Sequence, residues 1–292
     1  EFYGDSVQPA YVQNVANDMQ SAGLVFSGSA IPHLNFIDLA VPSEFHDLLK
    51  KSSTRLEFET RGDFIRNQRF RKDVFIKSEE CMSEQEQETF LMNLPFGTIC
   101  TQEDCTRSVF FGDIALNYVA DLFENLIQEL CTGAKSVNQL IQLSQFSAYQ
   151  PALILDAIRF LTASGQVVPF SRATDTPADK DLTANRYTLG GSYNLQILKH
   201  RLFAQKSIGM AAIDTGLVLE VSMSDALFAL CMAEAERDHV SAWAFQRLLE
   251  KGQEIETEDG DHAQALAQAV KEFRRKRLPK FLEFGILAPL AN

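Results

Sequence analysis

The chain has 292 residues, of which 46% are hydrophobic and 23% are charged, and its formal net charge is −12. This length suggests about two domains with buried cores, and the acidic balance argues against a general nucleic-acid coat, because phosphate binding needs clustered Lys and Arg. No stretch approaches ~18 uncharged apolar residues, and the first ten residues do not resemble a signal peptide, so we expect a cytoplasmic protein without a membrane span.

The first third of the chain predicts a small α+β domain that ends near Gly112. Helices are expected at 9–22, 41–51, 55–68 and 83–94. Short strands are expected at 24–30, 71–77 and 96–101. Pro9 and Gly23 mark the ends of the first helix, and Ser43 is expected to cap the second.

The middle of the chain has the element order of a winged helix. Helices are expected at 115–133, 136–145 and 149–165, with a stop at Gly133 and a cap at Ser136. The segments 166–172 and 185–191 are expected to pair as a hairpin that forms the wing. The second and third helices would then form a helix-turn-helix.

The remainder returns to helices. They are expected at 193–204, 222–236, 239–251 and 262–276, with a strand at 216–221 and an acidic loop at 251–262. Residues 277–290 echo 159–170, since both run from an apolar helix through Gly to extended residues and Pro. The fold class is therefore helix-rich α+β, divided into 1–112, 113–192 and 193–292, with the last region packed on the winged helix.

Motifs of catalysis and cofactor binding are missing from the sequence. None of the 15 glycines is separated from another by a single residue, so no GxGxxG exists, and there is no GxSxG or SxxK. TGAKS at 132–136 lacks the first glycine and the GK pair of a P-loop. The most tempting carboxylates lie in an acidic run that is typical of a solvated loop: Glu254, Glu256, Glu258, Asp259 and Asp261.

Cysteine and histidine spacing does not indicate a metal site. The five cysteines are scattered, form no CxxC and are interpreted as free thiols of a reducing compartment: Cys81, Cys100, Cys105, Cys131 and Cys231. The five histidines form neither HxxxH nor HExxH, so zinc is not expected: His33, His46, His200, His239 and His262.

The segment 66–77, RNQRFRKDVFIK, is a basic cluster in an acidic chain. A structural role is the first interpretation: Phe70, Val74 and Ile76 would face the core, and Asp73 would pair with Arg71 or Lys72. A docking role for an acidic protein surface is the second, because Arg can hold carboxylates with two parallel hydrogen bonds. The candidate interaction residues are Arg66, Asn67, Gln68, Arg69, Arg71 and Lys72. A second basic run at 271–280 is expected to complement a helix C-terminus.

Three segments in order, EFY, PAYVQNVA with SAGLVFSGSA, and DFIRNQRFRKDVF, resemble one family. It is the regulatory domain downstream of the catalytic domain in bacterial S-adenosylmethionine-dependent methyltransferases, some of which are protein-lysine methyltransferases. The matching positions are Pro9, Tyr11, Val15, Ala16, Gly23, Leu24, Gly28, Ser29, Ala30, Asp63, Phe64, Asn67, Gln68, Phe70, Arg71, Asp73 and Phe75. The resemblance implies that S-adenosylmethionine binds in a catalytic domain upstream of Glu1, outside this chain, and that the chain is a piece of a longer protein.

The sequence supports two hypotheses for the function, and they belong to different classes of protein. The first is a non-catalytic accessory region of a methyltransferase that positions a protein substrate or assembles domains. Its expected partners are its own catalytic domain, a protein substrate and a second copy in a homodimer, with no cofactor or catalytic residue in this chain. The second is a winged-helix DNA-binding regulator. The acidic wing loop, with Asp175, Asp179 and Asp181, and the few polar residues of 149–165 make nucleic acid the less expected partner.

Overall fold

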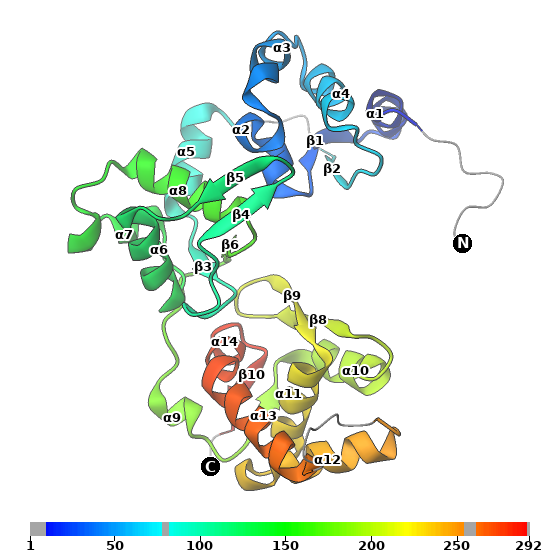
Figure 1. Ribbon diagram of the computed structural model, residues 1–292, viewed down its shortest axis with the longest axis vertical. Helices are drawn as coiled ribbons and strands as arrows, with labels where there is room; N and C mark the ends of the chain where they lie inside the picture. Colours follow the sequence, from blue (N-terminus) through cyan, green and yellow to red (C-terminus); the bar gives the residue numbers. More distant parts are fainter. Residues whose placement is uncertain (1–9, 78–81, 254–260, 291–292) are drawn as a thin grey trace, which may run out of the picture. The chain divides into compact units, whose positions relative to one another are not determined.

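The computed structural model describes residues 10–77, 82–253 and 261–290. Helices dominate it, and the described strands form two-stranded antiparallel sheets (Figure 1). The predicted helix-rich α+β class is therefore confirmed. Within these described ranges, no helix combines the length and the apolar character that crossing a bilayer requires.

The chain divides into two compact units, each made of separate stretches of sequence. The first unit contains Glu1–Leu91, Thr106–Glu124 and Ala152–Gln166, and the second contains Met92–Cys105, Asn125–Pro151 and Val167–Asn292. These units do not follow the three consecutive segments 1–112, 113–192 and 193–292. Those predicted domain boundaries, and the packing of the last region on a winged helix, stay predictions.

The elements of the first unit include a small sheet of β1 and β2. In chain order they are α1 (Val12–Ser21), β1 (Val25–Ser29), α2 (Ile37–Ala40), α3 (His46–Lys50), α4 (Arg55–Arg66), β2 (Asp73–Ile76), β4 (Ser108–Phe111) and β5 (Ile114–Asn117). Three helices contain residues of both units: α5 (Glu84–Asn93), α6 (Asp121–Cys131) and α8 (Pro151–Ala163). Most helices predicted in this part of the sequence are present, with ends shifted by a few residues.

Two local predictions in this unit are wrong. The segment 41–51 begins with a 3₁₀ turn at Ser43–Phe45, and the Ser43 side chain makes no cap, so α3 is short. The helix predicted from residue 115 begins six residues later, because Ile114–Asn117 pairs with Ser108–Phe111 as a hairpin. Gly112 has a φ of 59°, and a glycine adopts this left-handed conformation without steric cost.

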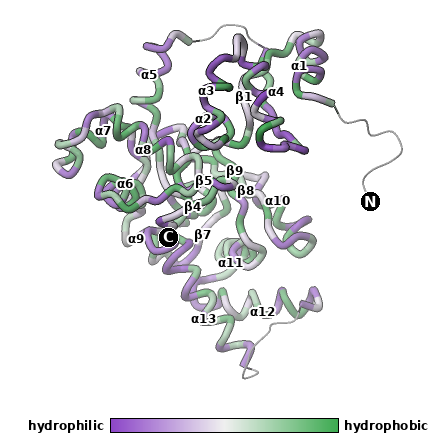
Figure 2. The backbone as a smooth tube through the Cα atoms, turned by 45° about the horizontal axis from the view of Figure 1, so that its top comes forward, coloured by the Kyte–Doolittle hydropathy of each residue, from purple (hydrophilic) through white to green (hydrophobic). Residues whose placement is uncertain are grey.

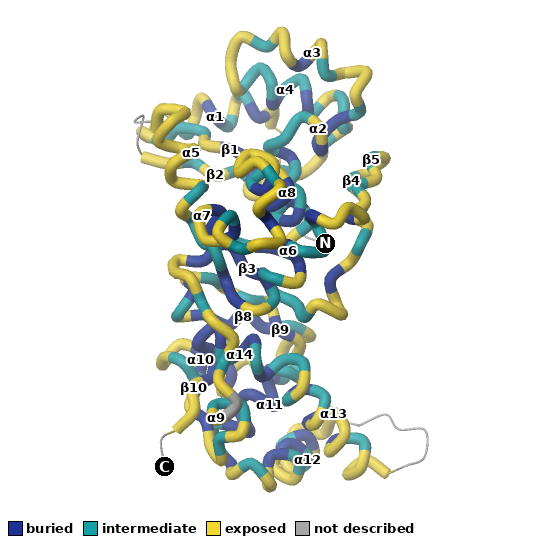
Figure 3. Tube along the Cα trace, turned by 90° about the vertical axis from the view of Figure 1, so that its left-hand side faces the viewer, coloured by how far each residue is buried: buried dark blue, intermediate teal, exposed yellow. Residues whose placement is uncertain are grey.

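The second unit holds the remaining elements. They are β3 (Phe96–Thr98), α7 (Val137–Leu140), β6 (Val167–Pro169), α9 (Asp179–Leu182), β7 (Tyr187–Leu189), α10 (Gly191–Arg201), β8 (Ser207–Ala212), β9 (Leu217–Ser222), α11 (Met223–Glu234), α12 (Val240–Glu250), α13 (His262–Lys276), α14 (Leu278–Glu283) and β10 (Leu287–Pro289). The helix α11 is buried along most of its length and is largely hydrophobic (Figures 2 and 3). Apolar side chains of α12, α13 and α14 belong to the same core. The strand β8, which pairs with β9, was not predicted.

The predicted wing does not form. The strand β6 pairs with β3, so that Phe96 lies opposite Pro169 and Thr98 lies opposite Val167. The strand β7 pairs instead with β10, in the register Tyr187↔Pro289, Thr188↔Ala288 and Leu189↔Leu287. The hairpin expected between 166–172 and 185–191 is therefore wrong. Each segment finds its partner far away in the sequence, which local patterns do not reveal.

The predicted order of long helix, short helix and helix is present as α6, α7 and α8, although α7 has only four residues. The helix-turn-helix of the last two helices and the winged-helix assignment stay predictions. Ser136 caps α7 as expected and forms a capping box with Gln139. The echo between 159–170 and 277–290 also has a structural counterpart. In both segments a helix ends, a glycine with positive φ follows (Gly165 and Gly285), and a three-residue strand pairs with an earlier strand.

Candidate functional site

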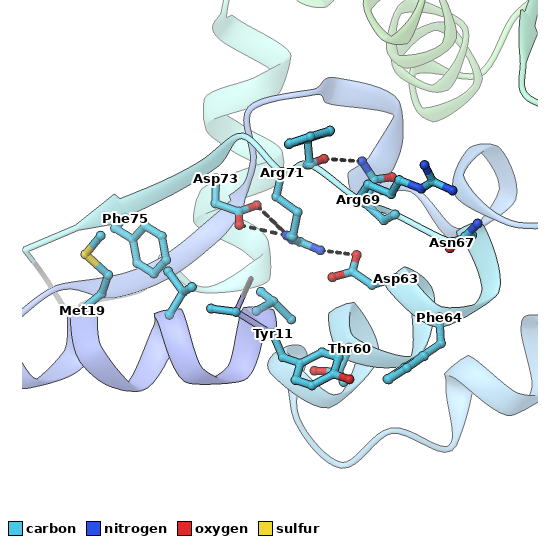
Figure 4. Close-up of a pocket in the computed structure, with 15 residues that line it drawn as sticks. Tyr11, Met19, Thr60, Asp63, Phe64, Asn67, Arg69, Arg71, Asp73 and Phe75 are labelled. Atoms are coloured by element: carbon cyan, nitrogen blue, oxygen red, sulfur yellow. Dashed lines mark hydrogen bonds and ion pairs between the residues drawn. The ribbon is translucent and has the colours of Figure 1, made fainter. Parts of the chain in front are cut away.

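A pocket of about 610 Å³ lies in the first unit, where α1, the end of α4 and the segment before β2 meet (Figure 4). Its lining residues are Ala10, Tyr11, Val12, Val15, Met19, Thr60, Asp63, Phe64, Asn67, Gln68, Arg69, Phe70, Arg71, Asp73 and Phe75. Many of these are positions of the family motifs, so segments that are separate in the sequence meet at one site.

Arg71 is the centre of an ion-pair network on one side of this pocket. Its guanidinium contacts three carboxylates: Glu59 Oε2 at 2.9 Å, Asp63 Oδ1 at 2.5 Å and Asp73 Oδ2 at 2.9 Å. Arg55 also pairs with Glu59 at 2.7 Å, and Arg66 with Asp63 at 3.1 Å. Three guanidinium groups thus balance three carboxylates, so the network has no formal charge to offer a partner.

Burial shapes the titration of this network. Burial opposes the charged form of Arg71, but hydrogen bonds to Asp73 and Glu59 outweigh it and raise the pKa of Arg71 above its ordinary value. Burial raises the pKa of Asp63, although Arg71 favours its charged form. Burial also lowers the pKa of Arg66. The ionised network therefore depends on all of its members staying in place.

The predicted interaction residues separate into two groups. Asn67, Gln68, Arg69 and Arg71 line the pocket, whereas Arg66 and Lys72 do not. Arg71 and Arg66 are held by carboxylates, as the structural interpretation of the basic cluster expects, and Asp73 pairs with Arg71 as predicted. Asn67 ends α4 in the left-handed conformation, with a φ of 51°.

Arg69 and Lys72 are exposed, and the structure gives neither of them an ion pair among the residues it describes. Arg69 therefore brings an uncompensated positive charge to the rim of the pocket. The docking interpretation of the cluster can apply to Arg69 but not to Arg71.

The expected inward orientation of three apolar side chains is wrong. Phe70 is 70% exposed, and Val74 and Ile76 are also exposed. The alternation of β2 instead turns Asp73 and Phe75 inward. The ion pairs of Arg71 with Asp63 and Asp73, which are mostly shielded from solvent, favour the orientation in which Asp73 points into the unit.

Aromatic side chains are the part of the pocket that charge patterns did not reveal. Tyr11 and Phe64 are both more than 60% exposed, and their ring centroids are 5.8 Å apart. With Phe70 they place three large exposed rings at one pocket. Glu59 was also missed, although its position four residues after Arg55 on a helix was a usable signal.

The glycine-rich motif SAGLVFSGSA has a structural explanation. Gly28 lies so close to Asn35 that an added Cβ would meet Asn35 Oδ1 at 2.8 Å. Asn35 exchanges two hydrogen bonds with Ser29, and the Ala30 amide donates to the Lys72 carbonyl at 2.8 Å. These contacts hold the segment before β2 in place, and thereby the residues that line the pocket.

Other candidates from the sequence carry structural roles or lie outside the described residues. In the run 271–280, Arg277 pairs with Asp225 at 3.2 Å, and the buried Lys280 pairs with Glu283 at 2.7 Å. Asp261 caps α13, whereas Glu254, Glu256, Glu258 and Asp259 lie outside the described residues. Within the described part of the chain, no group of three or more His, Cys, Asp or Glu side chains is arranged to hold a metal ion.

The helix α8, which would read DNA in a winged helix, offers few polar contacts. Arg159 is paired with both Asp38 and Asp156. The exposed positions include Leu153 and Asp156, which do not suit phosphate or base edges.

Comparisons with known proteins agree with the sequence motifs. Residues 1–77 match the family model of the predicted methyltransferase regulatory domain. The uncharacterized protein sll1526 of Synechocystis sp. is 20% identical over 295 residues, which cover 98% of this chain and 56% of that protein.

Solved structures show the same fold over almost the whole chain. PKMT2 from Rickettsia typhi matches with a TM-score of 0.62 and 12% identity, covering 99% of this chain and 60% of PKMT2. PKMT2 in complex with AdoHcy matches with a TM-score of 0.62 and 11% identity, covering 98% and 59%. The chain thus spans less than two thirds of the length of these relatives. The resemblance of residues 1–77 to the regulatory domain of methyltransferases is confirmed by the family model.

Proposed function

We propose that this chain is a non-catalytic accessory region of a protein methyltransferase that uses S-adenosylmethionine. Its association with methyltransferases rests on the match of residues 1–77. The observation that carries the proposal is that the motif residues of this segment build the pocket around Arg71. The accessory role lies in docking, either of a protein substrate or of the catalytic domain.

We expect this pocket not to bind S-adenosylmethionine itself. Dinucleotide and related cofactors need glycines where the backbone approaches them closely, and none of the described lining residues is glycine. The two carboxylates in the lining, Asp63 and Asp73, already pair with Arg71. No step of methyl transfer is therefore assigned to residues of this pocket.

An acidic protein segment suits the rim of the pocket. Arg69 supplies a charge without an ion pair in the described structure, and Tyr11, Phe64 and Phe70 supply exposed rings to the lining of the same pocket. Arg and aromatic residues contribute a large share of the binding energy in protein interfaces. A carboxylate on Arg69 with an apolar side chain against the rings would use both features.

The test compares methyl transfer in matched variants. In the protein that contains this chain and its catalytic domain, the double variant Arg69→Ala, Phe70→Ala should reduce methylation of a protein substrate about tenfold, which corresponds to ~1.4 kcal/mol. Leu249→Ala, which removes an exposed side chain of the second unit, is the control and should leave the rate unchanged. Equal rates for the wild type and both variants would contradict docking at this pocket.

A binding measurement tests the non-catalytic assignment separately. Calorimetric titration of the 292-residue chain with S-adenosylmethionine should give no binding heat at micromolar concentration. Saturable binding would show that this chain holds the cofactor, and the accessory assignment would then be wrong.

The DNA-binding alternative gains no supporting observation. Its wing does not form, and the one arginine of α8 is committed to carboxylates. We therefore retain the methyltransferase proposal alone.

A further inference from the structure

Three cysteines that are separated in the sequence gather in the second unit. Cys100 Sγ lies 2.9 Å from Cys105 Sγ. Cys131, the last residue of α6, places its Sγ 3.7 Å from the Cys100 carbonyl and 3.3 Å from Thr98 Oγ1. Thiols that are scattered along the chain therefore meet in the fold, while Cys81 lies outside the described residues.

A tight turn holds the first two thiols together. The amides of Asp104 and Cys105 both donate to the Thr101 carbonyl, at 3.1 and 3.2 Å, and the Thr101 hydroxyl donates to Asp104 at 2.7 Å. A disulfide has an S–S distance of about 2.05 Å. The two sulfur atoms therefore need to approach by less than about 1 Å, and the turn already brings their side chains face to face.

The surroundings favour a thiolate in this cluster. A hydrogen bond from Cys105 lowers the pKa of Cys100. A hydrogen bond from Cys105, with another from Thr98 and the charge of Lys280, lowers the pKa of Cys131 to about 6. Hydrogen bonds to Cys100 and Cys131, together with burial, raise the pKa of Cys105. Thiolates react with oxidants far faster than thiols do.

Small oxidants can reach this turn from solvent. Gln102, Glu103 and Asp104 are exposed and Cys100 is half-buried, whereas Cys105 is buried beneath the turn. Cys231 provides the contrast within the same unit: it is buried in α11, and burial raises its pKa to about 12. The unit thus contains one thiol cluster that is partly open to solvent at Cys100 and one inert thiol.

We propose that Cys100 and Cys105 are a peroxide-sensitive pair that closes to an intramolecular disulfide. The Cys100 thiolate attacks hydrogen peroxide, so that an S–O bond forms, the O–O bond breaks and hydroxide leaves. This hydroxide takes the proton of Cys105, which gives one water and the Cys105 thiolate. The Cys105 thiolate then attacks Cys100 Sγ, the S–S bond forms, the S–O bond breaks and a second hydroxide leaves. This hydroxide takes up the proton that Cys100 released, so two thiols and one peroxide give one disulfide and two waters.

Peptide mapping tests this proposal directly. The chain is treated with hydrogen peroxide, its remaining thiols are blocked, and it is digested with trypsin and a protease that cleaves after Glu. Cleavage after Glu103 separates the two cysteines, so only a disulfide can join peptide 89–103 to peptide 104–107. Titration of the denatured protein should fall from five thiols to three, and a reductant should restore five.

Matched variants distinguish this pair from other pairings. Cys131→Ser and Cys231→Ser should still give the joined peptides, whereas Cys100→Ser and Cys105→Ser should not. Circular dichroism before oxidation shows whether each variant is folded. Five titratable thiols after peroxide treatment of the folded chain would overturn the proposal, and so would a disulfide that joins Cys131 or a second chain instead.

Discussion

Replacement of Arg71 by alanine tests the inference that an ion-pair network, rather than apolar packing, fixes the pocket. The substitution removes a guanidinium that contacts Glu59, Asp63 and Asp73. Glu59 keeps Arg55, and Asp63 keeps Arg66. Asp73, whose side chain is 10% exposed, keeps no other ion pair among the described residues.

The expected cost follows from this single orphaned carboxylate. Breaking a buried ion pair costs ~3–5 kcal/mol, and the lower end applies here because water reaches the edges of the network. We expect Arg71→Ala to lower the free energy of unfolding by about 3 kcal/mol, which is a fall of roughly 10 °C in Tm for a unit of this size. Arg71→Lys should cost about half as much, because one ammonium keeps the charge but cannot bind three carboxylates at once.

Urea unfolding followed by circular dichroism measures this loss. The fluorescence of Trp243, the single tryptophan, reports on the second unit separately. Arg69→Ala is the matched control, since Arg69 is exposed, and its effect should stay within about 0.5 kcal/mol. A loss below about 1 kcal/mol for Arg71→Ala, or an equal loss for Arg69→Ala, would refute the reasoning and place these contacts among ordinary surface pairs.

Two further changes test other parts of the fold. A hydrogen bond from Arg159 lowers the pKa of Asp38. This carboxylate therefore stabilises the fold above its unfolded pKa of about 4, and the effect is lost as the pH falls through its folded pKa. The difference in unfolding free energy between the wild type and Asp38→Asn, measured by urea unfolding, should be larger at pH 7 than at pH 3. Gly190→Ala would place a Cβ 1.8 Å from the Gly285 carbonyl oxygen, and it should lower the free energy of unfolding, followed by Trp243 fluorescence, by at least about 2 kcal/mol. The control Gly252→Ala meets nothing within 4 Å and should lower it by about 1 kcal/mol. Equal losses for the two variants would contradict the close approach of Gly190 to Gly285.

The sequence predicted those features that local chemistry decides. The helix α4, the cap at Ser136 and the pairing of Arg71 with Asp73 follow from residues a few positions apart. The partners of β6 and β7 could not be predicted in this way, because β3 and β10 lie about 70 and 100 residues away from them. The hairpin of β4 and β5 was missed because the apolar residues after Gly112 also suit a helix.

The candidate site, too, could be predicted only where local chemistry decides the structure. The basic cluster at 66–77 stood out by its charge, and four of its six candidate interaction residues line the pocket. Sequence patterns could not show which cations were already neutralised, because Glu59 and Asp63 reach Arg71 from the preceding helix. Phe70 precedes β2, so its exposure is set by the segment between α4 and β2 rather than by the alternation of the strand.

The division of the first unit into three stretches has a consequence for its synthesis. Its last stretch, Ala152–Gln166, follows Leu91 by up to about 75 residues. At ~5–20 residues per second, translation delivers this stretch roughly 4–15 s after Leu91. During that interval the first two stretches of the unit are present on the nascent chain without the third, so we expect this unit to complete its fold only after residue 166 has left the ribosome.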